Sequence, residues 1–182
     1  MHSGNVGHAQ DLDSLVRSAT FLRDRDDLRI VIAGFGARHG EMVALANRLE
    51  VEGTVRFLPY QKRERLPLSL SSADVHVVGL AKGLAGYVVP SRLYGILSAG
   101  RPVIVAADDS SETARLVLEV GCGVVIPPAR PDLLARVIRE FADGAYPLDT
   151  MGRRGREYVV NEADSVVAME RYRALVREML AA

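Results

Sequence analysis

The chain of 182 residues is long enough for one large domain, and its 48% of hydrophobic residues supply an ample core. Its 23 basic and 23 acidic side chains cancel to a net charge of zero, which argues against a protein that coats nucleic acid. The single cysteine, Cys122, excludes an internal disulfide framework and fits a reducing compartment, where we expect it to be a small packed residue. No apolar run approaches the roughly 18 residues of a spanning helix, and no signal-peptide pattern opens the chain, so we expect a cytoplasmic protein.

The first turn of the chain comes early. Residues 3–7 form a glycine-rich turn of the kind that follows a first strand, yet almost no strand precedes them. A strand needs roughly five residues. We therefore expect that the first strand is clipped and that the chain was cut from something longer.

Short apolar strands alternate with helical patterns along the rest of the chain. A continuous apolar run such as 28–33 is typical of a strand buried on both faces of a parallel sheet. Alternation of this kind predicts an α/β fold, a doubly wound parallel six-stranded Rossmann-like sheet with C-terminal helices, in a single domain over residues 1–182. After the first turn, the predicted strands are 28–33, 54–58, 75–78, 103–106 and 123–126, and the predicted helices are 11–24, 41–50, 61–70, 110–119, 131–142, 150–161 and 164–180.

The loop and helix between the fourth and fifth strands carry the strongest candidate site. Pro90 suits the first turn of a helix, Ser91 can cap its free amides, and Gly100 is a natural helix stop. A helix start beside a flexible glycine loop offers unpaired amides to a phosphate, and Lys82 and Arg92 would add positive charge there. The alternative, a loop and helix that only connect two strands, stays open.

Other patterns are weaker candidates. Residues 34–40 match a dinucleotide-binding glycine turn, but the next strand ends at 58–60 without the acidic residue that binds a ribose, so a structural turn is favoured over an oxidoreductase. Asp108 and Asp109 are paired acids whose position is explained by helix capping. No nucleophile elbow or P-loop is present.

Metal binding is not expected, because the four histidines are scattered and lack ligand spacing. His76 lies in the middle of a strand and is expected to be a partly buried polar residue. His8 follows the first glycine turn, where it either contacts a ligand or faces solvent. The four are His2, His8, His39 and His76.

Five segments together resemble a known family: 3–7, 30–36, 55–59, 72–75 and, most specifically, 89–104. They resemble the carboxyl-terminal half of GT-B fold, family-4 glycosyltransferases. The likeness is strongest to bacterial amino-sugar transferases of surface-polysaccharide assembly. It covers the chain nearly end to end.

The resemblance implies the donor-binding domain of a retaining, metal-independent glycosyltransferase without a cofactor, which binds a UDP- or GDP-linked sugar and no nucleic acid. The amino-terminal Rossmann-like half of such an enzyme binds the acceptor, so the isolated chain is expected to be inactive, with its catalytic residues unassigned. The complete enzyme would act in the cytoplasm, at the inner face of the membrane. The donor-binding residues implied are Gly4, Asn5, Gly7, His8, Pro59, Tyr60, Gln61, Lys82, Tyr87, Pro90, Ser91, Arg92 and Leu93.

One departure from the family pattern concerns two glutamates that many members place eight positions apart across this loop and helix. The corresponding residues here are Tyr87 and Gly95. Their loss keeps a second interpretation open, a non-catalytic nucleotide-binding or interaction module that retained the fold. The last helix is predicted to carry an apolar stripe that packs on this domain or on a neighbouring copy, formed by Val166, Met169, Tyr172, Leu175 and Met179.

Overall fold

The structure is a computed structural model and describes residues 1–181. Its strands form two parallel three-stranded sheets, ordered β1-β2-β3 and β4-β5-β6. Two hydrogen bonds join them, because the Met1 amino group donates to Val75 O at 2.7 Å and Val77 N–H donates to Met1 O at 2.9 Å. The strands are β1 (His2–Ser3), β2 (Ile30–Ala33), β3 (Val55–Leu58), β4 (His76–Gly79), β5 (Val103–Ala106) and β6 (Gly123–Ile126).

Across that junction the strand order reads β3-β2-β1-β4-β5-β6, so the predicted doubly wound α/β architecture is confirmed. The order reverses between β1 and β4. In sheets of this kind ligands bind at the carboxyl ends of the strands beside such a reversal. The candidate segments that follow β1, β3 and β4 therefore share one edge of the sheet.

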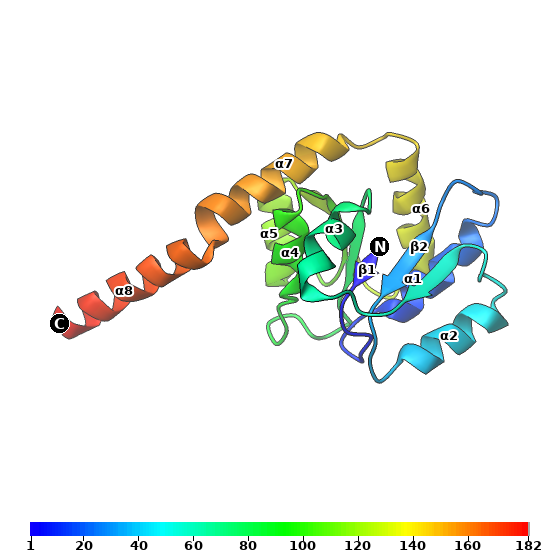
Figure 1. Cartoon of the computed structure of the whole chain (residues 1–182), viewed down its shortest axis with the longest axis horizontal. Helices are drawn as coiled ribbons and strands as arrows, with labels where there is room; N and C mark the ends of the chain where they lie inside the picture. Colours follow the sequence, from blue (N-terminus) through cyan, green and yellow to red (C-terminus); the bar gives the residue numbers. More distant parts are fainter. Residues whose placement is uncertain (182) are drawn as a thin grey trace.

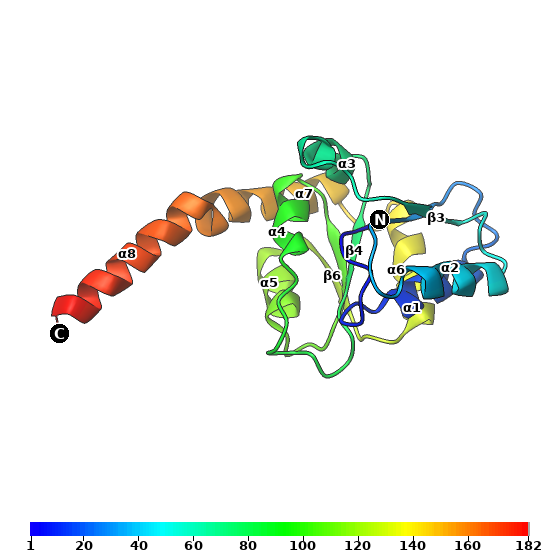
Figure 2. The ribbon, with the colours of Figure 1, turned by 60° about the horizontal axis from the view of Figure 1, so that its bottom comes forward.

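Helices cover both faces of the sheet (Figures 1 and 2). Helices α1, α2 and α6 lie against one face, and α4 and α5 lie against the other, with α7 crossing behind α4. The core divides accordingly into two clusters. The α-helices are α1 (Leu12–Ser18), α2 (His39–Arg48), α3 (Leu66–Ser71), α4 (Arg92–Ser98), α5 (Glu112–Val120), α6 (Pro131–Ala142), α7 (Leu148–Tyr158) and α8 (Ser165–Ala181).

The side chains of one buried strand pack into both core clusters. All four residues of β5 are buried, and successive side chains point to opposite faces. Val103 and Val105 enter the cluster under α4 and α5, whereas Ile104 and Ala106 enter the cluster under α1 and α6. A run of hydrophobic residues without alternation is thus what a doubly covered strand requires.

Several predicted boundaries and caps need correction. The strand predicted at 28–33 begins at Ile30, and the helix predicted at 41–50 spans His39–Arg48. Ser91 occupies the position before α4, but its side chain makes no capping bond. Ser111, not the aspartate pair, caps α5 by accepting a hydrogen bond from the Ala114 amide at 3.2 Å.

The carboxyl-terminal helices leave the body of the domain. After α7 a π-helical turn, Val159–Ala163, leads into α8, which projects away from the sheet in both views (Figures 1 and 2). Its predicted apolar stripe is exposed, from 51% at Leu175 to 71% at Met179. Of the two expected partners of this stripe, its own domain is therefore excluded, and packing on a neighbouring copy stays a prediction. Among the described helices, none combines the length and the apolar character that crossing a bilayer requires.

Candidate functional site

Three segments with predicted ligand contacts meet at the carboxyl edge of the sheet. Residues 4–8 follow β1, residues 59–61 follow β3, and residues 80–91 connect β4 to α4. Hydrogen bonds tie this edge together. The Tyr60 hydroxyl donates to Phe35 O at 3.0 Å, and the Ala81 N–H donates to Ala9 O at 2.9 Å.

Arg92, the first residue of α4, reaches the turn after β1. A Cβ atom built on Gly4 would lie 3.5 Å from the Arg92 Cζ, so the guanidinium lies directly against this turn. Arg92 Nη1 also lies 3.0 Å from His2 Nδ1 and 2.7 Å from His2 Nε2. Because arginine can only donate, His2 Nδ1 accepts the bond from Arg92 Nη1, and His2 Nε2 donates to Asn5 O at 3.3 Å. The bond requires a neutral His2.

The charge of Arg92 is not neutralised by a carboxylate. Within residues 1–181 its guanidinium takes part in none of the ion pairs. Burial lowers the pKa of Arg92, and the Tyr60 phenol acts in the opposite direction. Arg38, at the neighbouring turn, shows the contrast, because it pairs with Asp13 and Glu41 at 2.6 Å. A half-buried guanidinium without a counterion is a ready partner for a bound anion.

The backbone amides of the first turn are mostly engaged within the fold. Gly4 N–H donates to Ala33 O at 2.8 Å, Val6 N–H donates to Phe35 O at 3.0 Å, and Gly7 N–H donates to Gln10 Oε1 at 3.0 Å. The amides of Asn5 and His8 make no hydrogen bond to the described residues, and both residues are exposed. These two amides, rather than those of the glycines, are available to an incoming anion.

The glycines of the second turn are explained by close packing. A Cβ at Gly34 would lie 1.8 Å from Gly4 O, and one at Gly36 would lie 2.4 Å from Val6 O. Side chains at these two positions would collide with the backbone of the turn after β1. The glycine pattern of 34–40 is therefore required to seat the two turns together, in agreement with the structural interpretation.

Two exposed aromatic rings flank the same edge. Tyr60 is 56% exposed and Phe35 is 61% exposed, and the Phe35 ring stacks on His39 with ring centroids 4.8 Å apart. Sequence reasoning included Tyr60 but missed Phe35, since it treated the second turn only as a connection. An aromatic residue between two glycines at the end of a strand was the signal that could have identified it.

Some predicted site residues do not lie beside Arg92 and the turn after β1. The Leu93 side chain is buried in the core at 1% exposure, and Gln61 lies on the wall of a large cavity on the other side of the turn. Lys82 and Tyr87 are exposed on the loop before α4. Pro90 accepts a hydrogen bond from the Leu93 amide at 3.0 Å and so closes the turn that leads into α4.

The aspartate after β5 has a role that sequence reasoning did not assign. Asp108 Oδ2 accepts a hydrogen bond from the Gly83 amide at 3.1 Å. This bond ties the loop after β4 to the end of β5. The prediction that helix capping alone explains this residue is therefore wrong for Asp108.

The described residues contain no cluster of three or more potential metal-binding side chains. His76 is fully buried rather than partly buried, and its Nε2 lies 2.9 Å from Leu70 O, to which it donates. Cys122 is buried as predicted, and burial raises the pKa of its thiol to about 11. Such a thiol is not a nucleophile near neutral pH.

Two buried imidazoles predict acid sensitivity. Burial, with the Arg92 charge second, lowers the pKa of His2 from 6.5 to about 3, and burial lowers the pKa of His76 to about 4. Below pH 6.5 the two histidines are protonated in the unfolded chain but stay neutral in the folded chain. Their contribution to the free energy of unfolding is therefore fully present above pH 6.5 and is lost as the pH falls towards 4. Each unit of pKa difference contributes about 1.4 kcal/mol.

We expect the urea concentration at the unfolding midpoint to be lower at pH 4.5 than at pH 7. The variant His2→Gln should flatten this dependence, whereas His8→Gln, at an exposed histidine, should leave it unchanged. Equal midpoints for the unmodified chain at the two pH values would contradict the assignment of neutral buried imidazoles.

Comparison with known proteins gives the family. Residues 1–158 match the family described as glycosyl transferases group 1. The chain is 29% identical to the probable glycosyltransferase WbjE of Pseudomonas aeruginosa, over 97% of this chain and 43% of that protein. It is 30% identical to the putative colanic acid biosynthesis glycosyl transferase WcaI of Escherichia coli, over 77% of this chain and 34% of that protein. The chain thus spans less than half the length of these curated relatives.

A solved structure shows the same fold. Anabaena HepE, crystallised in complex with UDP-glucose, superposes with a TM-score of 0.78 at 16% identity, over 97% of this chain and 48% of HepE. This chain therefore has the fold of a region that makes up 48% of HepE. The chain belongs to the group 1 glycosyl transferase family.

Proposed function

We propose that the chain is the donor-binding domain of a nucleotide-sugar-dependent glycosyltransferase, in which Arg92 and the turn after β1 hold the diphosphate of the donor. The observation that carries this proposal is the half-buried guanidinium of Arg92, which lies against Gly4 and has no carboxylate partner among the described residues. His2 accepts a hydrogen bond from it and fixes its position. The exposed Asn5 and His8 amides lie on the same turn.

This arrangement suits the chemistry of sugar transfer. When the bond between the sugar and the diphosphate breaks, negative charge develops on the leaving phosphate oxygens. A fixed guanidinium and backbone amides aimed at those oxygens stabilise the charge without reorganising during the reaction. Charge-assisted bonds of this kind are roughly twice as strong as neutral ones. The chain's own contribution to catalysis would be to orient the donor and offset that charge.

The base of the nucleotide would rest near the loop after β3. Pro59 and Tyr60 are exposed there, and the Tyr60 hydroxyl is held by Phe35 O at 3.0 Å. Aromatic faces are suitable surfaces for a planar base, and stacking of this type contributes about 1–3 kcal/mol per base in single-stranded nucleic acid binding. Phe35 adds a second exposed ring at the same edge.

The relatives support the class of substrate. HepE was crystallised with UDP-glucose, and WcaI is described as a colanic acid biosynthesis enzyme. We infer that the whole protein transfers a sugar with retention of configuration to a polysaccharide or lipid-linked acceptor. An amino-terminal Rossmann-like half would bind that acceptor, with the protein at the cytoplasmic face of the membrane and this domain inactive by itself.

Calorimetric titration of UDP and GDP into the chain tests the proposal. We expect weak binding of one of the two nucleotides and no heat from the matching nucleoside, because the phosphates contribute the charged contacts. Absence of heat with both nucleotides would contradict donor binding by this domain.

The loop after β4 and helix α4 favour one alternative function, a non-catalytic nucleotide-binding module. The positions of the two family glutamates hold Tyr87, which is 86% exposed, and Gly95, whose added Cβ would lie 3.5 Å from Leu70 Cδ1. Neither position supplies a carboxylate to a donor sugar. Turnover of a sugar nucleotide by the full-length protein would support the enzyme, whereas binding without turnover would support the module.

A further inference from the structure

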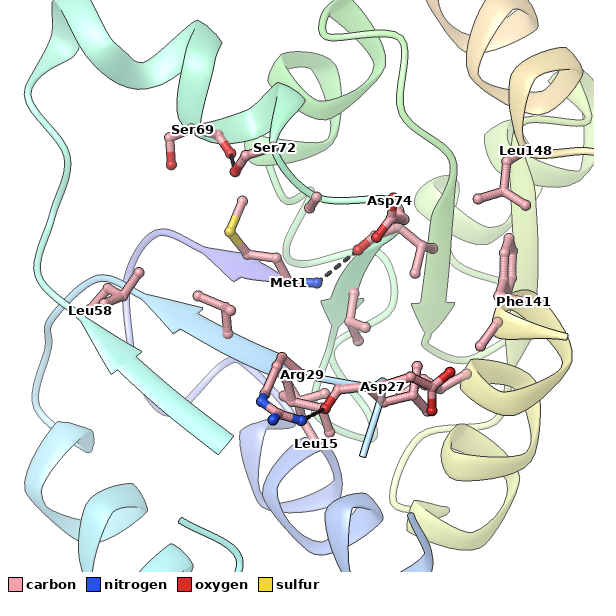
Figure 3. A pocket seen from close by; sticks show the side chains of 18 of the residues that line it. Met1, Leu15, Asp27, Arg29, Leu58, Ser69, Ser72, Asp74, Phe141 and Leu148 are labelled. Atoms are coloured by element: carbon pink, nitrogen blue, oxygen red, sulfur yellow. Dashed lines mark hydrogen bonds between the residues drawn. The ribbon is translucent and has the colours of Figure 1, made fainter. Parts of the chain in front are cut away.

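The loop after β4 starts from a well-bridged part of the sheet. Hydrogen bonds cross the junction between β1 and β4, where the strand order reverses, at both edges of the sheet. Figure 3 shows Met1 at the amino edge, where its amino group donates to Val75 O at 2.7 Å. At the carboxyl edge the Ala81 N–H donates to Ala9 O at 2.9 Å. Lys82 is therefore the first loop residue beyond the bridged junction.

Little packing fixes the loop beyond that point. Lys82, Gly83 and Gly86 are exposed, and a Cβ built on either glycine would meet nothing within 4 Å. Both glycines have positive φ angles, of 82° and 81°. Leu84 packs against the core, yet its amide reaches Ala81 O only at 3.3 Å. A single directed hydrogen bond can therefore decide the conformation of this part of the loop.

Asp108 supplies such a bond. Its Oδ2 accepts a hydrogen bond from the Gly83 N–H at 3.1 Å, and a bond to an ionised carboxylate is stronger than one to a neutral acceptor. The backbone around Asp108 is anchored, because the fully buried Ala107 donates its N–H to Ile126 O at 3.0 Å. The Asp108 carbonyl accepts from the Ser111 N–H at 2.9 Å. The end of β5 thus holds the carboxylate in place.

Asp109, the next residue, gives an internal contrast. It carries the same charge as Asp108 and is exposed. Within residues 1–181 its side chain takes part in no hydrogen bond or ion pair, whereas the carboxylate of Asp108 holds Gly83. Two adjacent acids therefore differ in their connection to the loop while their charges are equal.

The strand order places this loop beside the candidate diphosphate site. Strand β4 lies next to β1, and β5 lies next to β4, with neighbouring strands of a sheet about 4.8 Å apart. In the proposed function the base lies after β3 and the diphosphate after β1, so the far end of the nucleotide is directed towards β4 and β5. The Lys82 ammonium takes part in no ion pair among the described residues.

We propose that Asp108 is a positioning residue for donor binding. Through the Gly83 amide it holds the loop after β4 so that Lys82 contributes its charge to the terminal phosphate of the nucleotide. This inference rests on the proposed function, and Asp108 itself does not touch the nucleotide. A carboxylate near a bound anion weakens binding by its charge alone. The positioning role therefore has the opposite sign to the effect of the charge.

Three variants separate positioning from charge. Asp108→Ala removes the acceptor, Asp108→Asn keeps an oxygen acceptor without the charge, and Asp109→Ala removes the same charge from the adjacent position. In calorimetric titrations with UDP and GDP, we expect Asp108→Ala to weaken binding by about three- to fivefold, the size of one exposed charge contact. Asp108→Asn should bind as the unmodified chain does, and Asp109→Ala should bind equally or slightly more tightly. Tighter binding by both Asp108 variants would overturn the proposal.

Combining variants tests the part played by Lys82. Lys82→Ala should weaken binding by about three- to fivefold, and adding Asp108→Ala to it should weaken binding no further. Two changes that act through the same contact are not additive. Additive losses would show that Asp108 does not act through Lys82 and would overturn the proposal.

Hydrogen exchange tests the bond without any nucleotide. The Gly83 amide should exchange about tenfold faster in Asp108→Ala than in the unmodified chain, because a bond to a charged acceptor is lost. Asp108→Asn and Asp109→Ala should stay near the unmodified rate. Equal rates in all four proteins would overturn the proposal. Absence of heat from the unmodified chain with both nucleotides would overturn donor binding and this role together, whereas full affinity of a folded Asp108→Ala would overturn the positioning role alone.

Discussion

Replacing Arg92 by alanine should weaken binding of the nucleoside diphosphate by about 10- to 150-fold, that is by about 1.5–3 kcal/mol. The guanidinium lies against Gly4 and faces no carboxylate of the described residues, so no internal partner would replace the lost contact with phosphate. Removal of the side chain also leaves the buried His2 imidazole without its donor. Titration calorimetry with UDP and GDP measures the effect.

Two further variants show whether the effect belongs to the site. Arg92→Lys keeps the charge but loses the planar fork, so it should bind with intermediate affinity. Arg48→Ala removes one positive charge from the exposed end of α2, away from the turn after β1, and should bind as the unmodified chain does. If Arg92→Ala retains full affinity while remaining folded, Arg92 has no part in the site.

Replacing Gly34 by alanine should destabilise the fold by about 3 kcal/mol or more, because strained backbone and a steric clash act together. The added Cβ would lie 1.8 Å from Gly4 O, a backbone atom that cannot move without shifting the whole turn after β1. The backbone of Gly34 also has φ of 150°, a conformation that side chains disfavour. Urea denaturation measures the loss.

Gly40→Ala is the matched control for this substitution. Gly40 lies in the first turn of α2, and a Cβ there meets nothing within 4 Å. Alanine is the better helix former by about 1 kcal/mol, so this variant should be as stable as the unmodified chain or slightly more stable. Equal stability of the Gly34 and Gly40 variants would contradict the packing of the two turns.

If the Gly34→Ala variant remains folded, titrating it with UDP would show whether displacing the turn after β1 also weakens nucleotide binding.

The fold was predictable because its strongest signals are local. Runs such as 103–106 are apolar throughout, which a strand between two helical layers requires. The alternation of such runs with amphipathic helices then limits the topology. Boundaries were less accurate: α2 begins at His39, two residues before its predicted start, because its first turn is fixed by contacts with the turn after β1 rather than by a cap in its own sequence.

The candidate site was predictable in part. The family resemblance assigned Gly4 and Arg92 to one donor site, and the structure has the Arg92 guanidinium against Gly4. Sequence reasoning could not find His2 as the partner of Arg92, since that contact joins residues 90 positions apart. Nor could it tell that Gly4 and Gly7 use their amides within the fold, because hydrogen-bond partners on other loops leave no local pattern.

The most direct measurement is a nitrogen–proton NMR titration of the chain with UDP and GDP, observing backbone amides and the Arg92 Nε–H. If the diphosphate is held at the carboxyl edge, the nucleotide that binds will shift the amides of Asn5 and His8 together with the Arg92 signal. Amides at the amino edge, such as Val75, will not move. Saturable shifts confined to the amino edge, or none anywhere with either nucleotide at millimolar concentration, would contradict the account.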